Sequence, residues 1–280
     1  MSLSSQTGII IAGVDGRMGR VIAQCVLASN DVTLIGAFDR KGSDAIGQDV
    51  GELAGLGKAG ISVGDNFEDI ALKKKAGPAV LIDFTMPLAT IYHAGLCAEN
   101  GIAHAIGTTG FTPDEDAQIN AQSQKCAIVK ARNMSTGVTL LSVLVERAAK
   151  SLGEDFDIEI TEAHHRHKVD APSGTALLLG EAAAHGRGVS MEDKSVRARD
   201  GITGERRSGD IGFSVVRGGG IIGDHSVMYA SEAESITLSH HALDRSLFAR
   251  GALRAALWLT QNGTDLRAPG LYDMKDVLGL

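Results

Sequence analysis

The sequence has little of three things that would direct it to other classes of protein: cysteine, a basic excess and long apolar runs. It has three cysteines, Cys25, Cys97 and Cys126, each in an apolar context. Because they are few and odd in number, we expect reduced thiols in the core of a cytoplasmic protein and not a disulfide framework. No apolar run approaches the length of a membrane span. The opening residues, MSLSSQTG, lack the basic and apolar stretches of a secretory signal.

The charge balance argues against polyanionic partners. Lys and Arg number 27 against 34 Asp and Glu, which gives a net charge of −7. General binding to nucleic acid or to a membrane surface needs a basic face, so neither is expected. The 280 residues leave room for one large domain or two of ordinary size.

The first half of the chain alternates short apolar runs with segments of helical periodicity. This alternation predicts an α/β, Rossmann-type doubly wound parallel sheet. The expected strands lie at 9–12, 32–38, 79–84, 102–106 and 127–130, with a further short strand near 61–63. The expected helices lie at 21–28, 87–100 and 113–124.

A glycine-rich turn follows the first expected strand. Gly13, Gly16 and Gly19 form a GxxGxxG pattern, with Asp15 where the commoner GxGxxG has its second glycine. The second expected strand ends at Asp39. Strand, glycine turn, helix, strand and acid together are typical of a dinucleotide-binding unit, in which glycines allow a pyrophosphate close to a helix N-terminus.

The second half of the chain has a different pattern. A long amphipathic helix is expected at 137–152, a strand at 157–164, a helix at 176–185, and three successive strands at 211–216, 226–229 and 235–241, with a surface loop at 186–210. Successive strands without helices between them favour an antiparallel or mixed sheet in a second, α+β domain. A last helix at 247–261 is expected to return to the first domain. We therefore predict one domain from residues 1–135 with 245–280, and a second from 136–244.

The segment Glu162–Thr175, EAHHRHKVDAPSGT, is the most informative part of the sequence. Five consecutive residues from His164 to Lys168 include three histidines, an arginine and a lysine, in an acidic chain. Ser173 is a good helix N-cap, and the amides after it would be free to bind a carboxylate or phosphate. Imidazoles beside an anion-binding helix start suit an enzyme that moves a proton on a small acid.

Two plainer interpretations of this segment stay open. It could be a solvated loop, although the helix-capping signal that follows is more specific than a loop requires. It could also bind a metal, but the histidines lack the usual zinc spacing and no cysteine is near in sequence. We expect no metal.

The segment EAHHRHKVDAPSGTA resembles the signature of the 4-hydroxy-tetrahydrodipicolinate (dihydrodipicolinate) reductase family. The resemblance extends over most of the chain, through GxxGRMG, IDFT, the 107–109 turn, Ile211-Gly212-Phe213 and the helical segment 255–259. Two positions depart from the family pattern: Gly220, where an acid is more common, and Met86, where an arginine is common. Both lie outside the central segment, so they put only local loop contacts in doubt.

The resemblance implies NAD(P)H-dependent reduction of a small dicarboxylate, with loss of water, in the diaminopimelate route to lysine, by a homotetramer. It implies that His164 is a general acid/base and Lys168 a proton donor, and that His165, Gly174 and Thr175 hold the substrate. The residues that it assigns to the cofactor are Gly13, Val14, Asp15, Gly16, Arg17, Met18, Asp39, Arg40, Gly107, Thr108, Thr109, Ala131, Arg132, Asn133 and Met134.

Two alternatives to this function remain. A non-enzymatic redox sensor could bind NAD(H) through the first domain, but it would not need proton donors beside an anion site. Another small-acid dehydrogenase could have the same two-domain organisation, and spacing alone would not name its substrate. For the cofactor, Asp39 favours NADH, whereas Arg40 could bind the 2′-phosphate of NADPH, so we expect the protein to accept both.

Overall fold

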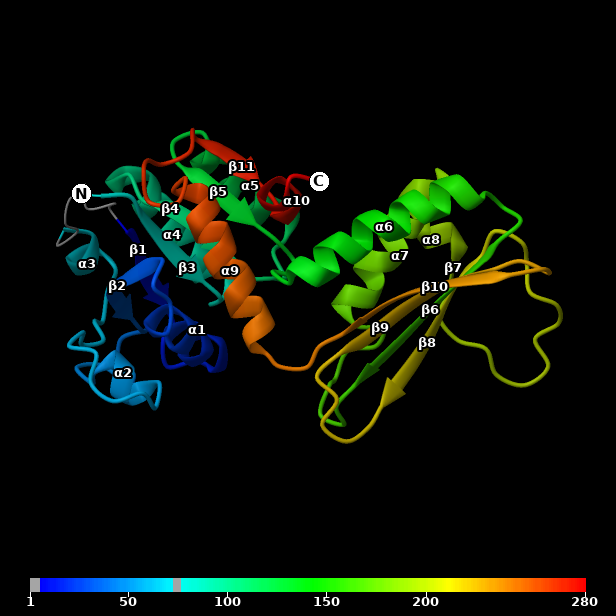
Figure 1. Ribbon diagram of the computed structural model, residues 1–280, viewed down its shortest axis with the longest axis horizontal. Helices are drawn as coiled ribbons and strands as arrows, with labels where there is room; N and C mark the ends of the chain where they lie inside the picture. Colours follow the sequence, from blue (N-terminus) through cyan, green and yellow to red (C-terminus); the bar gives the residue numbers. More distant parts are fainter. Residues whose placement is uncertain (1–5, 73–76) are drawn as a thin grey trace. The chain divides into compact units, whose positions relative to one another are not determined.

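The computed structural model describes residues 6–72 and 77–280. The chain divides into two compact units (Figure 1). The first contains the chain up to Ser135 together with Ser246–Gly279, and the second contains Thr136–Arg245. Within the described ranges, no helix is both long enough and apolar enough to cross a bilayer.

The first unit contains a six-stranded parallel sheet with the strand order β11-β5-β4-β3-β1-β2. Its strands are β1 (Thr7–Ala12), β2 (Val32–Phe38), β3 (Ala79–Asp83), β4 (Ala103–Ile106), β5 (Ala127–Lys130) and β11 (Gly270–Tyr272). Its helices are α1 (Arg17–Leu27), α2 (Val50–Leu53), α3 (Glu68–Leu72), α4 (Pro87–Asn100), α5 (Pro113–Ser123), α9 (Ser246–Leu259) and α10 (Met274–Leu278).

Helices cover both faces of this sheet. Alternate side chains of β1 point to opposite sides, so Ile9 and Ile11 pack with α1 and α9 whereas Ile10 packs with α4 and α5. All three isoleucines are fully buried. Because both faces are covered, the strands are apolar runs, as parallel strands in doubly wound sheets are.

The strand order places a topological switch point at the carboxyl ends of β1 and β3. The chain leaves β1 for β2 on one side, and later strands are added on the other side of β1. The two ends are close, since a Cβ on Gly13 would lie 2.9 Å from the Thr85 methyl group. Ligands of open α/β sheets bind at such points.

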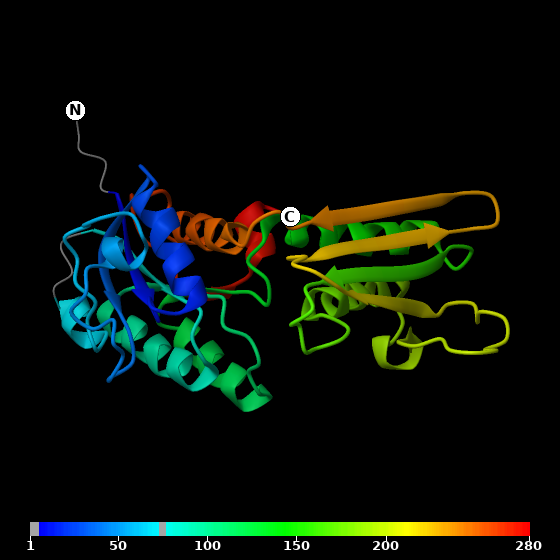
Figure 2. The same cartoon turned by 90° about the horizontal axis from the view of Figure 1, so that it is seen from below.

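The second unit contains a five-stranded mixed sheet with the order β10-β9-β6-β8-β7. Its strands are β6 (Asp157–His164), β7 (Ser195–Val196), β8 (Ile211–Arg217), β9 (Asp224–Ala230) and β10 (Ser235–His241). Its helices are α6 (Thr136–Leu152), α7 (Gly174–Arg187) and α8 (Met191–Lys194). Helices α6 and α7 lie along one face of the sheet in both views (Figures 1 and 2), and their apolar side chains form its core with the strands.

Two predictions of local structure are corrected, and a third is narrowed. The strand expected near 61–63 is reduced to isolated bridges of Ser62 with Asp49 and Gly64 with Phe38. The second sheet is mixed, the latter of the two arrangements expected, because β8 runs parallel to β6 and is separated by it from β9. The expected loop at 186–210 contains α8 and β7, whose four and two residues are too short for periodicity to reveal.

Candidate active site

Four polar side chains lie together at one end of the second sheet: Glu162, His164, Arg217 and His225. Along β6, the side chains of Ile158, Ile160, Glu162 and His164 are all buried and alternate with more exposed neighbours. They therefore point to the face covered by helices. Arg217 pairs in register with His164, and His225 pairs with Glu162. The register thus brings residues distant in sequence to the strand end from which the His164–Lys168 run begins.

The Glu162 carboxylate accepts hydrogen bonds from several neighbours. Its side chain is 0% exposed. Arg217 donates from Nη1 to Oε2 at 2.7 Å and from Nη2 to Oε1 at 2.8 Å, and the backbone N–H of Ser173 donates to Oε1 at 3.0 Å. Burial by itself would raise the pKa of this carboxyl group, but these donors and His164 outweigh it and lower the pKa. Glu162 is therefore an ionised carboxylate at neutral pH.

His164 contacts that carboxylate through one ring nitrogen. Its Nδ1 lies 2.6 Å from Oε2 of Glu162. Its Nε2 is turned toward Gly223, where a Cβ would lie 3.1 Å from it. The His225 ring stands edge-on at a centroid distance of 5.1 Å. Burial and the neighbouring His164 lower the pKa of His225 to about 4, so His225 is neutral at pH 7.

Helix α7 begins beside these side chains, as the capping signal predicted. Ser173 is the N-cap, and its Oγ accepts a hydrogen bond from the Ala176 N–H at 3.1 Å. The same hydroxyl lies 3.0 Å from Nε2 of His225. The structure thus brings Gly174 and Thr175 to the first turn of this 14-residue helix, next in the chain to the buried Ser173. The expected capped helix start is therefore present.

The other two candidate residues of this segment lie in the loop after β6. The backbone N–H of His165 donates to Ile221 at 2.7 Å, and the ring lies 3.4 Å from the Arg245 guanidinium. Burial lowers the pKa of His165, and the positive charge of Arg245 lowers it further. Lys168 donates from Nζ to Asp170 at 2.8 Å.

The glycine turn of the first unit is tightly packed. Gly13 has a φ of +64°, which favours glycine. A Cβ on Gly19 would lie 2.1 Å from the Gly13 carbonyl oxygen, so helix α1 and the turn touch through backbone. Gly16 is the N-cap of α1 and has no side chain to occupy the first amides of the helix. Val14 and Met18 contribute to the apolar core behind the turn, and Arg17 is exposed.

Asp15, Asp39 and Arg40 lie around the same turn. Asp39 accepts hydrogen bonds from the backbone of Asp15 at 3.0 Å and of Arg40 at 2.8 Å, and Asp15 pairs with Arg20. A cavity of about 340 Å³ is lined here by Gly13, Asp15, Gly16, Asp39, Arg40, Ser43, Phe84, Thr85 and Met86.

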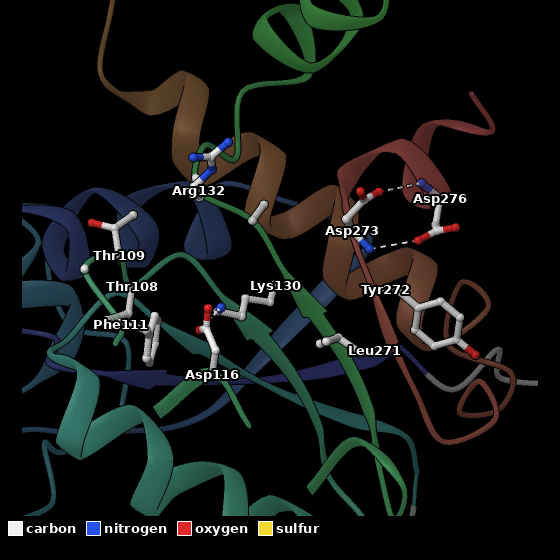
Figure 3. Close-up of a pocket in the computed structure, with 12 residues that line it drawn as sticks. Thr108, Thr109, Phe111, Asp116, Lys130, Arg132, Leu271, Tyr272, Asp273 and Asp276 are labelled. Atoms are coloured by element: carbon white, nitrogen blue, oxygen red, sulfur yellow. Dashed lines mark hydrogen bonds and ion pairs between the residues drawn. The ribbon is translucent and has the colours of Figure 1, made fainter. Parts of the chain in front are cut away.

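The remaining candidates follow β4 and β5. Thr108, Thr109, Ala131 and Arg132 line a cavity of about 420 Å³ (Figure 3). The expected set did not include its other lining residues, Gly110, Phe111, Asp116, Lys130, Leu271, Tyr272, Asp273 and Asp276. Gly107 packs against the Phe84 ring, and Asn133 accepts the backbone N–H of Ser135. The Met134 side chain is buried in the core, so only its backbone could reach a ligand.

The comparisons with known proteins cover both units. Models for dihydrodipicolinate reductase match residues 7–134 (N-terminus) and 137–278 (C-terminus). The 4-hydroxy-tetrahydrodipicolinate reductase of Dinoroseobacter shibae is 53% identical over 99% of this chain and 100% of its own, and that of Brucella melitensis is 52% identical over 98% and 99%. The chain belongs to the dihydrodipicolinate reductase family.

A solved structure is similar in fold to this dihydrodipicolinate reductase family member. The dipicolinate-bound dihydrodipicolinate reductase from Paenisporosarcina sp. TG-14 has a TM-score of 0.73 and 24% identity, and the match covers 96% of this chain and 97% of that one. The expected combination of a parallel α/β sheet with a mixed second sheet is therefore confirmed. Enzymes of the family are oxidoreductases of lysine biosynthesis that use NADH or NADPH.

The glycine turn fits such a cofactor. The close backbone packing at Gly13 and Gly19, the helix start at Gly16 and the carboxylate of Asp39 at the end of β2 are the features that a dinucleotide needs. Among the described residues, no group of His, Cys, Asp and Glu could hold a metal ion.

Several residues around the candidate site were missed by the sequence reasoning. Glu162 lies inside the segment that was singled out, but its function as a buried acceptor depends on Arg217, which is 55 residues further along the chain. In the first unit, Asp83 is fully buried and accepts hydrogen bonds from the hydroxyl of Thr85 at 2.6 Å and from Nδ1 of His93 at 2.8 Å. Asp83 thereby holds the loop after β3 at the switch point.

Proposed function

We propose that this chain reduces 4-hydroxy-tetrahydrodipicolinate to tetrahydrodipicolinate with NADH or NADPH, with loss of water. The observation that carries the assignment of residues is the group at the end of β6, where a buried carboxylate holds the imidazole of His164 beside the capped start of α7. A proton-transfer group beside an anion-binding helix start suits a reaction on a small dicarboxylate.

The two units have different roles in this proposal. We assign the cofactor to the first unit, at the glycine turn, Asp39 and the loops after β4 and β5, and the substrate to the second. When bound, the nicotinamide supplies the hydride. The uncapped first turn of α1 would hold the pyrophosphate, and Asp39 keeps lone pairs beyond its two backbone hydrogen bonds for the adenosine ribose.

His164 and Lys168 supply protons. Loss of the 4-hydroxyl as water leaves an unsaturated imine, and hydride addition to this imine leaves an electron-rich carbon that must gain a proton. An imidazole exchanges protons near neutral pH, and His164 is held in one orientation by Glu162. The Lys168 ammonium has three donors, of which one is directed to Asp170, so others remain for the substrate.

The substrate carboxylates are assigned to the start of α7. The backbone amides of Gly174 and Thr175 lie in its first turn, and His165 lies in the loop that leads to it. The relative from Paenisporosarcina is described as bound to dipicolinate, a planar dicarboxylate, which supports a substrate of this chemical class.

We propose that the protein is a cytoplasmic homotetramer. Its three cysteines are thiols and not disulfides, and burial raises the pKa of the Cys97 and Cys126 thiols, which suits a reducing compartment. The face of the second sheet that α6 and α7 leave uncovered carries the exposed apolar side chains Val216 and Met228, which suit association between sheets.

An NADH-oxidation assay tests the function. The reaction is started with condensed pyruvate and aspartate semialdehyde, and NADH absorbance should fall only when both precursors are present. A protein that leaves NADH unchanged with this substrate but oxidises it with another small keto acid would be the alternative dehydrogenase.

A further inference from the structure

The hydrogen bonds of Glu162 determine which nitrogen of His164 carries a proton. The two carboxylate oxygens accept two hydrogen bonds from Arg217 and one from the Ser173 N–H. The remaining short contact, 2.6 Å, is to Nδ1 of His164. Because Glu162 is ionised and can only accept, this contact requires an N–H at Nδ1.

The other ring nitrogen is then the one that exchanges a proton. Nδ1 stays protonated in both charge states of the ring, so a proton can enter or leave His164 only at Nε2. The space next to Nε2 is kept open by Gly223, because a Cβ there would approach to 3.1 Å. The neighbouring His225 cannot supply a second charge at pH 7, since its pKa is about 4.

We propose that Glu162, anchored by Arg217, is a positioning residue that fixes the Nδ1–H tautomer of His164 and confines proton transfer to Nε2. The same carboxylate accepts the Ser173 N–H, so it also ties the imidazole to the start of the proposed carboxylate site. The inference rests on the function proposed above for His164. Neither the family comparisons nor the sequence pattern assigns Glu162.

The tautomer can be measured without an activity assay. Protein labelled with ¹⁵N-histidine, with the His164 signals assigned by their loss in His164→Gln, should show a protonated Nδ1 and an unprotonated Nε2 at a pH where the ring is neutral. In Glu162→Gln the amide group offers an N–H to the ring, so the two nitrogens should exchange roles. A parent protein with the proton on Nε2 would overturn the proposal even if the variant did not fold.

Kinetic measurements distinguish a role of Glu162 in orienting His164 from a role only in stabilising the strand. Glu162→Gln should lower kcat by about 100-fold or more, as reversed tautomers do in other enzymes, while KM and NADH affinity stay within about threefold. Glu159→Gln is the matched control, because Glu159 lies on the same strand and binds Arg199 and Arg206 without contacting a histidine. It should retain parental kcat.

The outcomes are distinct. A reversed tautomer with low kcat supports the proposal, and an unchanged tautomer in Glu162→Gln overturns it. A reversed tautomer with parental kcat would leave the tautomer assignment standing but remove His164 from the proposed function. Gly223→Ala provides a second probe, since its methyl group should crowd Nε2 and lower kcat while Nδ1 stays protonated.

Discussion

At the scale of single residues, we expect both proposed proton donors to be needed for turnover. His164→Ala and Lys168→Ala should each lower kcat by roughly 10²–10⁴-fold, the range for a lost acid–base group. NADH affinity should hardly change, because both residues belong to the second unit, whereas the glycine turn belongs to the first. Steady-state kinetics and NADH titration test this. Parental turnover in either variant would exclude that residue from the chemistry.

We propose that Asp39 and Arg40 set the preference between the cofactors. A carboxylate favours the ribose hydroxyls and repels a 2′-phosphate, whereas the adjacent guanidinium attracts it. Both groups border solvent, so each effect is modest, and we expect NADH to be preferred by at most about tenfold. Asp39→Ala should shift kcat/KM toward NADPH, and Arg40→Ala should weaken NADPH more than NADH. A thousandfold preference in the parent would mean that another residue decides.

His225 should make the folded protein sensitive to mild acid. Its pKa falls from 6.5 to about 4 on folding. Between these values the unfolded chain binds a proton that the folded chain does not, so stability is lost as pH falls from 6.5 to 4. The shift corresponds to roughly 3 kcal/mol. In urea unfolding, the free energy of unfolding should fall more between pH 7 and pH 4.5 for the parent than for His225→Gln. His185→Gln, at an exposed histidine, should behave like the parent.

At the scale of elements, α1 packs closely on the glycine turn. In Gly19→Ala the new methyl group would meet only backbone, the Gly13 carbonyl at 2.1 Å and the Val14 Cα at 2.6 Å. We expect a loss of about 1–3 kcal/mol, as for other overpacked positions, together with weaker NADH binding.

Gly95→Ala is the matched control for Gly19→Ala. Gly95 also lies within a helix, α4, but a Cβ there meets no atom within 4 Å. This change should stabilise the protein by about 0.5–1 kcal/mol, because alanine is the better helix former. Thermal unfolding measures the change in stability caused by each variant. Equal changes would show that the backbone around Gly19 can shift to accommodate the methyl group.

The elements that the sequence predicted are those with long, regular patterns. β2, α4, β6 and β10 have the expected bounds, because apolar periodicity and caps such as Gly101 mark them clearly. β7, β11 and α10 were missed because two to five residues carry no measurable period.

The proton-donor segment could be recognised from the sequence because its residues are adjacent in the chain. The neighbours of His164 could not be predicted, because Arg217 and His225 are brought to it only by the register of β8 and β9 with β6. Pairing between distant strands is a tertiary property, which local patterns do not specify. Sequence therefore indicated the chemistry of the site but not how its groups are oriented.

At the scale of the whole molecule, the uncovered face of the second sheet should determine assembly. Val216 is 48% and Met228 38% exposed in the single chain. Sedimentation at micromolar concentration should give a tetramer, and a charged residue in place of Met228 should weaken it. A parent that sediments as a monomer would contradict the proposed assembly.

The division of the chain also has a consequence for its synthesis. α9 packs on α1, and Gly251 approaches the Met134 carbonyl so closely that a Cβ would lie 1.7 Å from it, while β11 completes the edge of the first sheet. The first unit therefore lacks essential parts until the last segment has left the ribosome. The segment that forms the second unit is synthesised earlier, so we expect the second unit to fold first, in contrast to the usual order in which the amino-terminal domain does.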